Sequence, residues 1–161
     1  MGFLTSHIIF KKLEERSIRV SDLIEAALEV FVPHPSVDGS LDSKEAIKEI
    51  LEEELKIAVS DFNVCSLLLA GLRLDEDGSK GLIPNLSIKD YKSDTIALVA
   101  DEILGMALAN YIGGTRAIFQ FNQFERLKPG IIGKLTPFLD DIISGLLAGC
   151  LTNVYNKKIL R

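Results

Sequence analysis

The chain has 161 residues, of which 47% are hydrophobic and 25% charged, and its formal net charge is −5. This length is typical of one domain, and the apolar content excludes general disorder. The acidic balance argues against a dedicated nucleic-acid binder, because such proteins usually carry a basic patch. We therefore expect a single domain over residues 1–161 that does not bind nucleic acid.

Cysteine usage and hydropathy favour a cytoplasmic protein. Cys65 and Cys150 are far apart and no CxxC occurs, which excludes a disulfide scaffold or a cysteine-rich zinc site. The start of the chain lacks the basic stretch of a signal peptide. The longest uncharged runs, 103–115 and 142–156, hold 13 and 15 residues. A membrane helix needs about 20 apolar residues, so we expect no integral membrane segment.

Apolar residues recur at helical spacing between prolines and polar turns. Helices are predicted over 21–31, from 42–45 through Leu55, over 61–74, 93–112 and 115–126, and from 137 to about 157. Asp75-Glu76-Asp77-Gly78 is predicted to be a polar turn, and Gly113-Gly114 a helix end. No alternating strand pattern of useful length occurs. The prediction is an all-α fold, a compact domain of about seven helices.

The charge is distributed unevenly along the chain. Residues 1–94 hold 18 acids and 11 bases, whereas residues 95–161 hold 5 acids and 7 bases. Four of those five acids form two adjacent pairs, Asp101-Glu102 and Asp140-Asp141, inside the most apolar helices. Solvated helix faces do not show this pattern. Capping of helix N-termini is the alternative explanation for each pair.

The spacing of small residues would allow the two acidic pairs to meet. Asp101 is followed at i+4 and i+8 by Gly105 and Ala109, and Asp141 by Gly145 and Gly149. Small residues allow two helix backbones to approach closely, so facing stripes would bring the carboxylates together in an apolar setting. Unpaired charges there are costly, and a divalent cation or basic partners would offset that cost. Oxygen ligands without Cys or His favour Mg²⁺ or Mn²⁺ over zinc.

Basic residues near these pairs are candidates for binding a phosphate. Arg116, Arg126 and Lys128 lie in the segment that connects the two acidic helices. His34, in Val32-Pro33-His34-Pro35, is interpreted as a loop residue rather than a ligand. The glycine-striped helices also suggest a homo-oligomer.

Three motifs follow one another in the second half of the chain. They are Asp101-Glu102-x-x-Gly105, Phe121-x-x-Phe124-Glu125-x-x-Lys128-Pro129 and Asp140-Asp141-x-x-x-Gly145. In this order they resemble the phosphatidylglycerophosphatase A family, well over about 95–150 and more loosely over 20–75. Residues 128–135 are similar to its soluble YutG-type branch. Residues 109–115 and 138–141 are similar to the archaeal CobZ-type α-ribazole phosphatases.

The resemblance implies an all-helical, Mg²⁺-dependent phosphomonoesterase, with Mn²⁺ as an alternative ion. By position it implies metal ligands at Asp101, Glu102, Asp140 and Asp141, and a catalytic set of Asp101, Glu102, Asp141 and Lys128. Substrate contacts are expected from Lys128, Arg126, Asn110 and Glu125. Glu125 stands where membrane-bound members usually have Asp, and Asn122 where they often have Arg, which argues against a phospholipid head-group site.

These observations favour hydrolysis of a small soluble phosphate ester. The first substrate predicted is α-ribazole 5′-phosphate, or the related cobalamin 5′-phosphate, in cobalamin biosynthesis. Phosphatidylglycerophosphate is the second. The alternative from another class is a non-catalytic helical binding module that forms oligomers. In such a module, Arg116, Arg126 or Lys128 would occupy the acidic pairs and leave no room for a metal.

Overall fold

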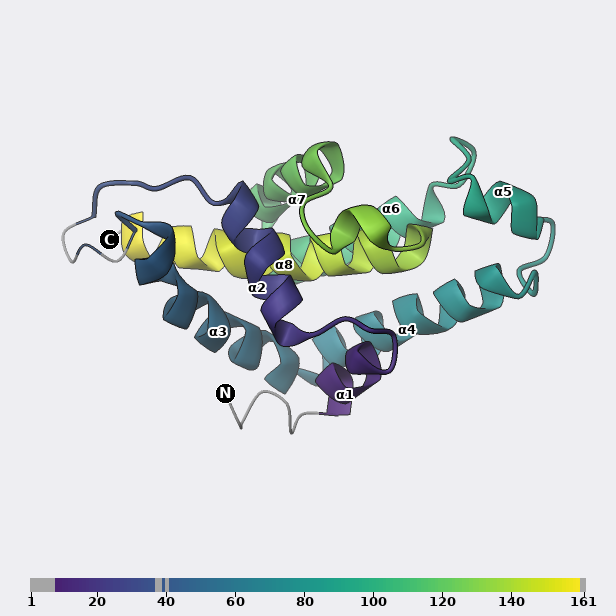
Figure 1. Ribbon diagram of the computed structural model, residues 1–161, viewed down its shortest axis with the longest axis horizontal. Coiled ribbons are helices and arrows are strands. Elements are labelled where there is room, and N and C mark those ends of the chain that lie inside the picture. Colours follow the sequence, from purple (N-terminus) through teal and green to yellow (C-terminus); the bar gives the residue numbers. More distant parts are fainter. Residues whose placement is uncertain (1–7, 37–38, 40, 160–161) are drawn as a thin grey trace.

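The computed structural model describes residues 8–36, 39 and 41–159, which are helical with no strand among them (Figure 1). The helices are α1 (Ile8–Glu14), α2 (Val20–Val30), α3 (Lys44–Ser60), α4 (Phe62–Ser79), α5 (Ile88–Lys92), α6 (Ala100–Gly113), α7 (Thr115–Leu127), the short 3-10 helix η1 (Ile132–Lys134) and α8 (Pro137–Ile159). The all-α prediction is confirmed. The start of the chain, where no signal peptide is expected, lies outside the described residues.

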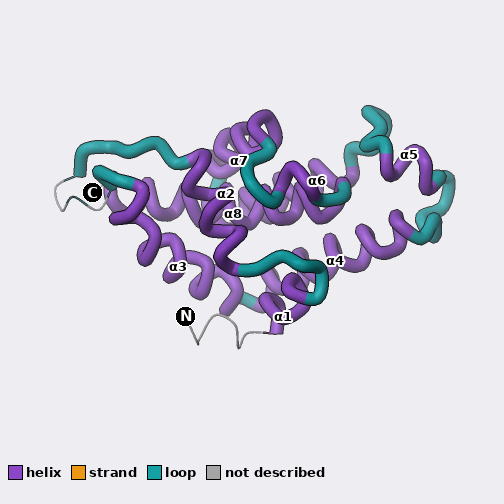
Figure 2. Tube along the Cα trace, viewed as in Figure 1, coloured by secondary structure: helices purple, strands orange, loops and turns teal. Residues whose placement is uncertain are grey.

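Helix α8 is the centre of the fold (Figure 2). It is buried without interruption from Pro137 to Thr152, because α2, α3, α4, α6 and α7 all pack against it. A helix that is apolar on every side normally occupies such a buried position. Figure 1 shows α2 crossing in front of α8 and α6 lying behind it.

Helices α6 and α8 run parallel and touch along the predicted small-residue stripes. A Cβ atom added to Gly105 would lie 2.5 Å from the carbonyl oxygen of Asp141, and one added to Gly145 would overlap the carbonyl of Gly105. Further along, Gly113 meets the carbonyl oxygen of Gly149. The two stripes therefore face each other, which is the arrangement that would bring the carboxylates together. Because these glycines are used within one chain, they no longer argue for an oligomer.

The predicted polar turn at residues 75–78 is wrong, because α4 continues through it to Ser79. Asp75 is buried inside the helix, where the Tyr91 and Thr136 hydroxyls donate to its Oδ1 at 2.5 Å each. Arg16 Nη1 donates to its other oxygen at 3.4 Å. Gly78 lies directly against the Tyr91 ring. Residues distant in the sequence therefore supply the hydrogen bonds of the Asp75 carboxylate, which the local sequence pattern places in a solvent-exposed turn.

The helix predicted from 93 to 112 begins later than expected. Residues 88–92 form the short helix α5, and α6 starts only at Ala100. Between them, Asp94 adopts a left-handed conformation (φ 50°) rather than capping a helix. Gly114 (φ 72°) ends α6, as its sequence predicts.

Caps and ion pairs define the ends of α3 and α4. The Ser43 side chain accepts from Ala46 N, and the Asp61 side chain accepts from Asn63 N, as expected of N-cap residues. Glu54 of α3 is buried, and its carboxylate pairs with Lys157 of α8. Both cysteines are free thiols, with Cys150 buried and Cys65 half-buried.

Within the described residues, no single helix has the length and apolar character needed to cross a membrane. Helices α3 and α4 meet that requirement only as a pair, and the pair is bent by 88°.

Candidate metal centre

Three helix ends meet at one end of the α6–α8 pair. The parallel arrangement places the first turns of α6 and α8 together, and α7 ends beside them. Asp101 and Glu102 lie in the first turn of α6, and Asp140 in that of α8. Helix N-termini favour negative charge, so the capping explanation accounts for part of this pattern. It does not account for burial, because Asp101 and Asp141 are only 2% and 3% exposed.

The core of the site is a group of three carboxylates. Glu125, Asp140 and Asp141 each offer an oxygen atom, and these oxygens all lie within 4.8 Å of one another. Two adjacent residues at the start of α8 thus face one residue from the last turn of α7. The sequence predicts Asp140 and Asp141 as metal ligands but assigns Glu125 to substrate binding. The structure places Glu125 in the carboxylate group itself.

Lys128 reaches into this group from the end of α7. Its Nζ lies 2.6 and 2.7 Å from the two oxygens of Asp140 and 2.8 Å from Glu125 Oε2. Burial by itself lowers the pKa of Lys128, but the hydrogen bonds to Asp140 and Glu125 outweigh it and hold the pKa above its ordinary value. Lys128 is therefore a charged side chain held among these carboxylates. Its predicted contact with a phosphate stays a prediction.

The backbone of Lys128 is unusual. With φ 43° and ψ 57°, it is a left-handed residue that caps the C-terminus of α7, a conformation that costs an L-residue about 1–2 kcal/mol. Its loop is anchored on α2, because Gly130 N donates to Glu29 Oε2 at 3.2 Å. This turn carries the Lys128 side chain back toward Asp140.

Buried oxygens without partners remain in the site. Glu125 Oε1, Asp141 Oδ1 and Ser144 Oγ are each buried and accept no hydrogen bond among the described residues. Burial, followed by the hydrogen bond and charge of Glu125, raises the pKa of Asp141 far above its usual range. Carboxylates this close must share a proton or bind a cation. All of these donors are hard oxygens, so the residues present fit Mg²⁺ or Mn²⁺.

Asp101 borders this group from α6, and Glu102 does not. The Asp101 carboxylate is buried, and its Oδ1 accepts from Glu102 N at 2.9 Å. Burial and the charges of Asp94 and Glu102 raise the pKa of Asp101, and its own charge acts on Asp141. The Glu102 side chain is exposed.

Asp94 is the acid that sequence reasoning missed. Its charge contributes to the raised pKa values of both Asp101 and Asp140, which places it beside the site. In sequence Asp94 resembles an ordinary helix cap. No motif marks it in the sequence, and in the structure its backbone is left-handed (φ 50°).

Three other predicted residues lie apart from the carboxylates. Asn110 is exposed on α6, nine residues from Asp101 and hence about 13 Å along the helix axis. Arg126 is exposed and donates to Gln123 Oε1 at 2.8 Å. Arg116 donates to Asn156 Oδ1 near the opposite end of α8. Of the basic residues considered from sequence, the structure brings only Lys128 to the acidic group.

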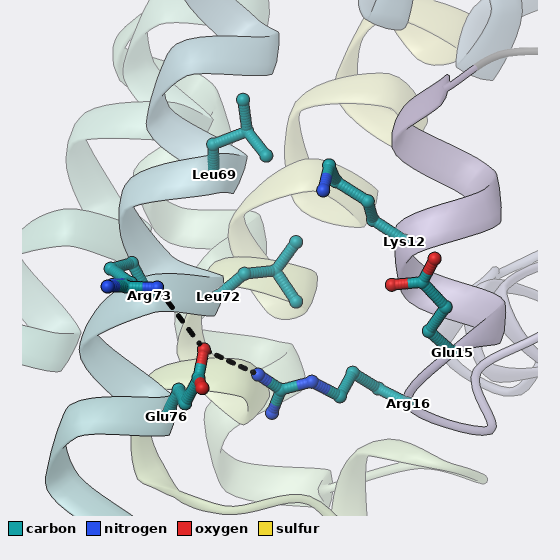
Figure 3. Close-up of a pocket in the computed structure, with 7 residues that line it drawn as sticks. All are labelled: Lys12, Glu15, Arg16, Leu69, Leu72, Arg73 and Glu76. Atoms are coloured by element: carbon teal, nitrogen blue, oxygen red, sulfur yellow. Dashed lines mark ion pairs between the residues drawn. The ribbon is translucent and has the colours of Figure 1, made fainter.

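A separate pocket of about 320 Å³ lies between α1 and α4 (Figure 3). Acidic and basic side chains line this pocket. Glu76 forms ion pairs with Arg73 at 3.6 Å and with Arg16 at 3.7 Å. The lining also includes the aliphatic side chains of Leu69 and Leu72. Because both arginines are already paired, this pocket has no free arginine for an anion.

The chain is similar to known proteins in sequence and in fold. An uncharacterized protein of Methanocaldococcus jannaschii is 38% identical over 136 residues, which cover 82% of this chain and 99% of that relative. Among solved structures, protein ypjQ of Bacillus subtilis has a TM-score of 0.75 at 20% identity, over 93% of this chain and 92% of that one. The low temperature requirement C protein of Listeria monocytogenes also has a TM-score of 0.75, at 21% identity over 92% and 93% of the two chains.

The two solved structures share the fold of this chain. A family model described as Phosphatidylglycerophosphatase A matches residues 44–156, a range that contains all three motifs and the whole carboxylate group. The chain therefore belongs to the phosphatidylglycerophosphatase A family.

Proposed function

We propose that this protein is a phosphatase that uses Mg²⁺ or Mn²⁺ to hydrolyse a small phosphate monoester. Membership of the family indicates phosphatase activity. The observation that carries the metal dependence is the group of Glu125, Asp140 and Asp141, in which two buried oxygens lack any partner. A cation would satisfy those oxygens and remove the repulsion between the carboxylates.

The proposed ligand set keeps Asp140 and Asp141 from the set predicted by sequence, loses Asp101 and Glu102, and gains Glu125. Glu125, Asp140 and Asp141 would hold the ion, and Asp101 borders them from α6. When bound, such an ion polarises a phosphoryl oxygen and lowers the pKa of a water molecule. Glu102 is exposed at the rim of the site and is assigned to the substrate side.

The protein's own residues supply the remaining requirements. Lys128 Nζ is a permanently charged donor beside Asp140 and Glu125, suited to an oxygen that gains charge in the transition state. The N-termini of α6 and α8 also favour an anion at this end of the pair. Asp101, buried next to the group, is available as the base that takes a proton from water.

The proposed substrate is α-ribazole 5′-phosphate, or the related cobalamin 5′-phosphate. Support comes from the similarity of residues 109–115 and 138–141 to the archaeal enzymes, and from Glu125 and Asn122 at positions where membrane-bound members differ. The family name makes phosphatidylglycerophosphate the second candidate.

A non-catalytic binding module remains the rival proposal. In such a module, a basic side chain is expected to form an ion pair with one of the acidic pairs. Lys128 does contact Asp140 in this way. The same ammonium does not reach Asp141, whose Oδ1 has no partner. This difference between the two neighbours favours a site that takes a cation.

Release of inorganic phosphate tests the proposal. The purified protein is incubated with α-ribazole 5′-phosphate, phosphatidylglycerophosphate and a simple aryl phosphate, each with Mg²⁺ or EDTA. We expect release only with the cation, and a loss of at least about 100-fold in Asp141→Asn. Asp77→Asn, on α4 and paired with Arg73, should keep full activity. Equal release in EDTA, or full activity in Asp141→Asn, would overturn the proposal.

A further inference from the structure

Asp75 is a buried carboxylate that lies outside the carboxylate group of the candidate site. It is on α4 and is only 2% exposed. The hydroxyls of Tyr91 and Thr136 donate to one of its oxygens, Oδ1, at 2.5 Å each. Arg16 reaches α4 from the end of α1 (Figure 3) and contacts the other oxygen at 3.4 Å. An apolar side chain would pack α4 against α8 without the cost of burying a charge, so packing alone does not account for Asp75.

The two hydroxyl partners of Asp75 each bond, through their backbone, to an acid at the candidate site. The Thr136 carbonyl accepts from Asp140 N at 2.9 Å, and the Tyr91 carbonyl accepts from Asp94 N at 3.1 Å. Asp140 belongs to the carboxylate group, and the charge of Asp94 acts on it. One buried carboxylate is thus connected, through a single residue each time, to two acids from different parts of the chain.

Tyr91 is packed between α4 and α8. A Cβ atom added to Gly78 of α4 would lie 2.8 Å from its ring, so this glycine leaves room for the tyrosine. On the other side the ring stacks on Phe138 of α8, with 6.1 Å between the centroids. The first four amides of a helix have no partner within it, and Phe138 N donates to the Tyr91 hydroxyl at 3.3 Å. Tyr91 therefore joins Asp75 to the first turn of α8.

We propose that Asp75 is a positioning residue of the candidate metal centre. Through Thr136 and Tyr91 it fixes where Asp140 and Asp94 lie, and it acts only through those two partners. The inference rests on the proposed function, because it concerns the same acids. Loss of a hydrogen-bonded partner that orients metal ligands typically lowers metal affinity about 10–100-fold.

Amide hydrogen exchange in the metal-free protein tests this role at the start of α8. Thr136→Val removes one of the hydroxyls bound to Asp75 with little change of shape, and Thr136→Ser keeps it. In Thr136→Val, the amides of residues 138–140 should exchange at least about tenfold faster relative to those in the middle of α8, because the first turn opens more often. Thr136→Ser should exchange like wild type.

Glu54→Gln is the matched control for a general loss of stability. Glu54 is also a buried carboxylate, but it lies on α3 and pairs with Lys157 near the other end of α8. Its replacement should leave the relative exchange of residues 138–140 unchanged.

Calorimetric titration with Mn²⁺ measures whether the acids of the site depend on Asp75. Asp75→Asn and Thr136→Val should each raise the Mn²⁺ dissociation constant about tenfold, and Thr136→Val carries the test if Asp75→Asn does not fold. Thr136→Ser and folded Glu54→Gln should bind Mn²⁺ like wild type.

The outcomes separate this proposal from the proposed function. Wild-type exchange or wild-type Mn²⁺ affinity in Thr136→Val would overturn the positioning role, as would an equal loss of affinity in folded Glu54→Gln. If wild type itself binds no Mn²⁺, the proposed function fails, and the exchange rates alone decide whether Asp75 holds the start of α8.

Discussion

Lys128 combines a strained backbone with a buried charge, and both features serve the same site. Its left-handed conformation ends α7, and its ammonium contacts both oxygens of Asp140. Strain of this kind persists only where the surroundings compensate for it, and it is common at functional sites. The Lys128 side chain and the turn that positions it can therefore be tested separately.

Two substitutions at Lys128 separate these roles. Lys128→Gly and Lys128→Ala both remove the ammonium, and each should lower the rate of phosphate release about 100-fold or more. Glycine accepts the left-handed conformation and alanine does not, so Lys128→Ala should be less stable than Lys128→Gly by about 1 kcal/mol. Urea unfolding measures that difference. Equal stability of the two variants would contradict the strain assigned to this residue.

Glu125 is the residue whose role the structure changes most. From the sequence, Glu125 is expected among the substrate contacts. Its Oε1 is nevertheless buried without a partner beside Asp140 and Asp141. Sequence could not show this convergence, since Glu125 and Asp140 are separated by a turn and the helix η1.

Glu125→Gln should therefore weaken cation binding rather than substrate binding alone. We expect the Mn²⁺ dissociation constant, measured by calorimetry, to rise at least about tenfold. Glu49→Gln, an exposed residue of α3, should bind Mn²⁺ like wild type. Unchanged Mn²⁺ affinity in Glu125→Gln, with a raised KM for the phosphate ester, would show that Glu125 contacts the substrate rather than the cation.

Helices α6 and α8 hold the acidic residues in place through direct backbone contact. The sequence indicated that this pair was possible, because a four-residue spacing of small residues marks one face of a helix. The turn predicted at Asp75 was wrong because the partners of this carboxylate are distant in sequence. Tyr91 and Thr136, which bind Asp75, lie 16 and 61 residues away along the chain. Local patterns do not contain such contacts.

Gly105→Ala tests the close approach of the two helices. The added methyl group would lie 2.5 Å from the carbonyl oxygen of Asp141, so the helices must separate, at a cost of about 1–3 kcal/mol in unfolding free energy. Mn²⁺ affinity should fall as well, because Asp141 moves. Gly149→Ala crowds Ile112 two turns further along, and should lower stability while leaving Mn²⁺ affinity unchanged. Equal effects of both variants on Mn²⁺ binding would contradict this account.

At the scale of the whole molecule, cation binding and folding stability are linked through pH. Burial raises the pKa of Asp140 to about 7 and that of Asp141 further. A carboxyl group with a raised pKa in the folded state favours folding below its unfolded pKa of about 4. That contribution is lost as pH rises through the folded value. A bound cation reverses this trend, because it requires the charged form.

Thermal unfolding at pH 5 and pH 8 measures this linkage. The rise in melting temperature caused by Mn²⁺ should be larger at pH 8 than at pH 5, because protons compete less for the carboxylates. In Asp141→Asn the Mn²⁺ effect should be small at both values. The same rise at pH 5 and pH 8 in wild type would show that these buried carboxylates do not bind the ion.

Glu125, Asp140 and Asp141 are proposed to form a divalent-cation site. Isothermal titration of the purified protein with Mn²⁺ at pH 8, with circular dichroism as the check on folding, tests this proposal. We expect saturable binding by wild type and by Asp77→Asn, and a loss of at least about tenfold in affinity in folded Asp141→Asn. If Asp141→Asn binds Mn²⁺ with the affinity of wild type, these carboxylates do not form the cation site.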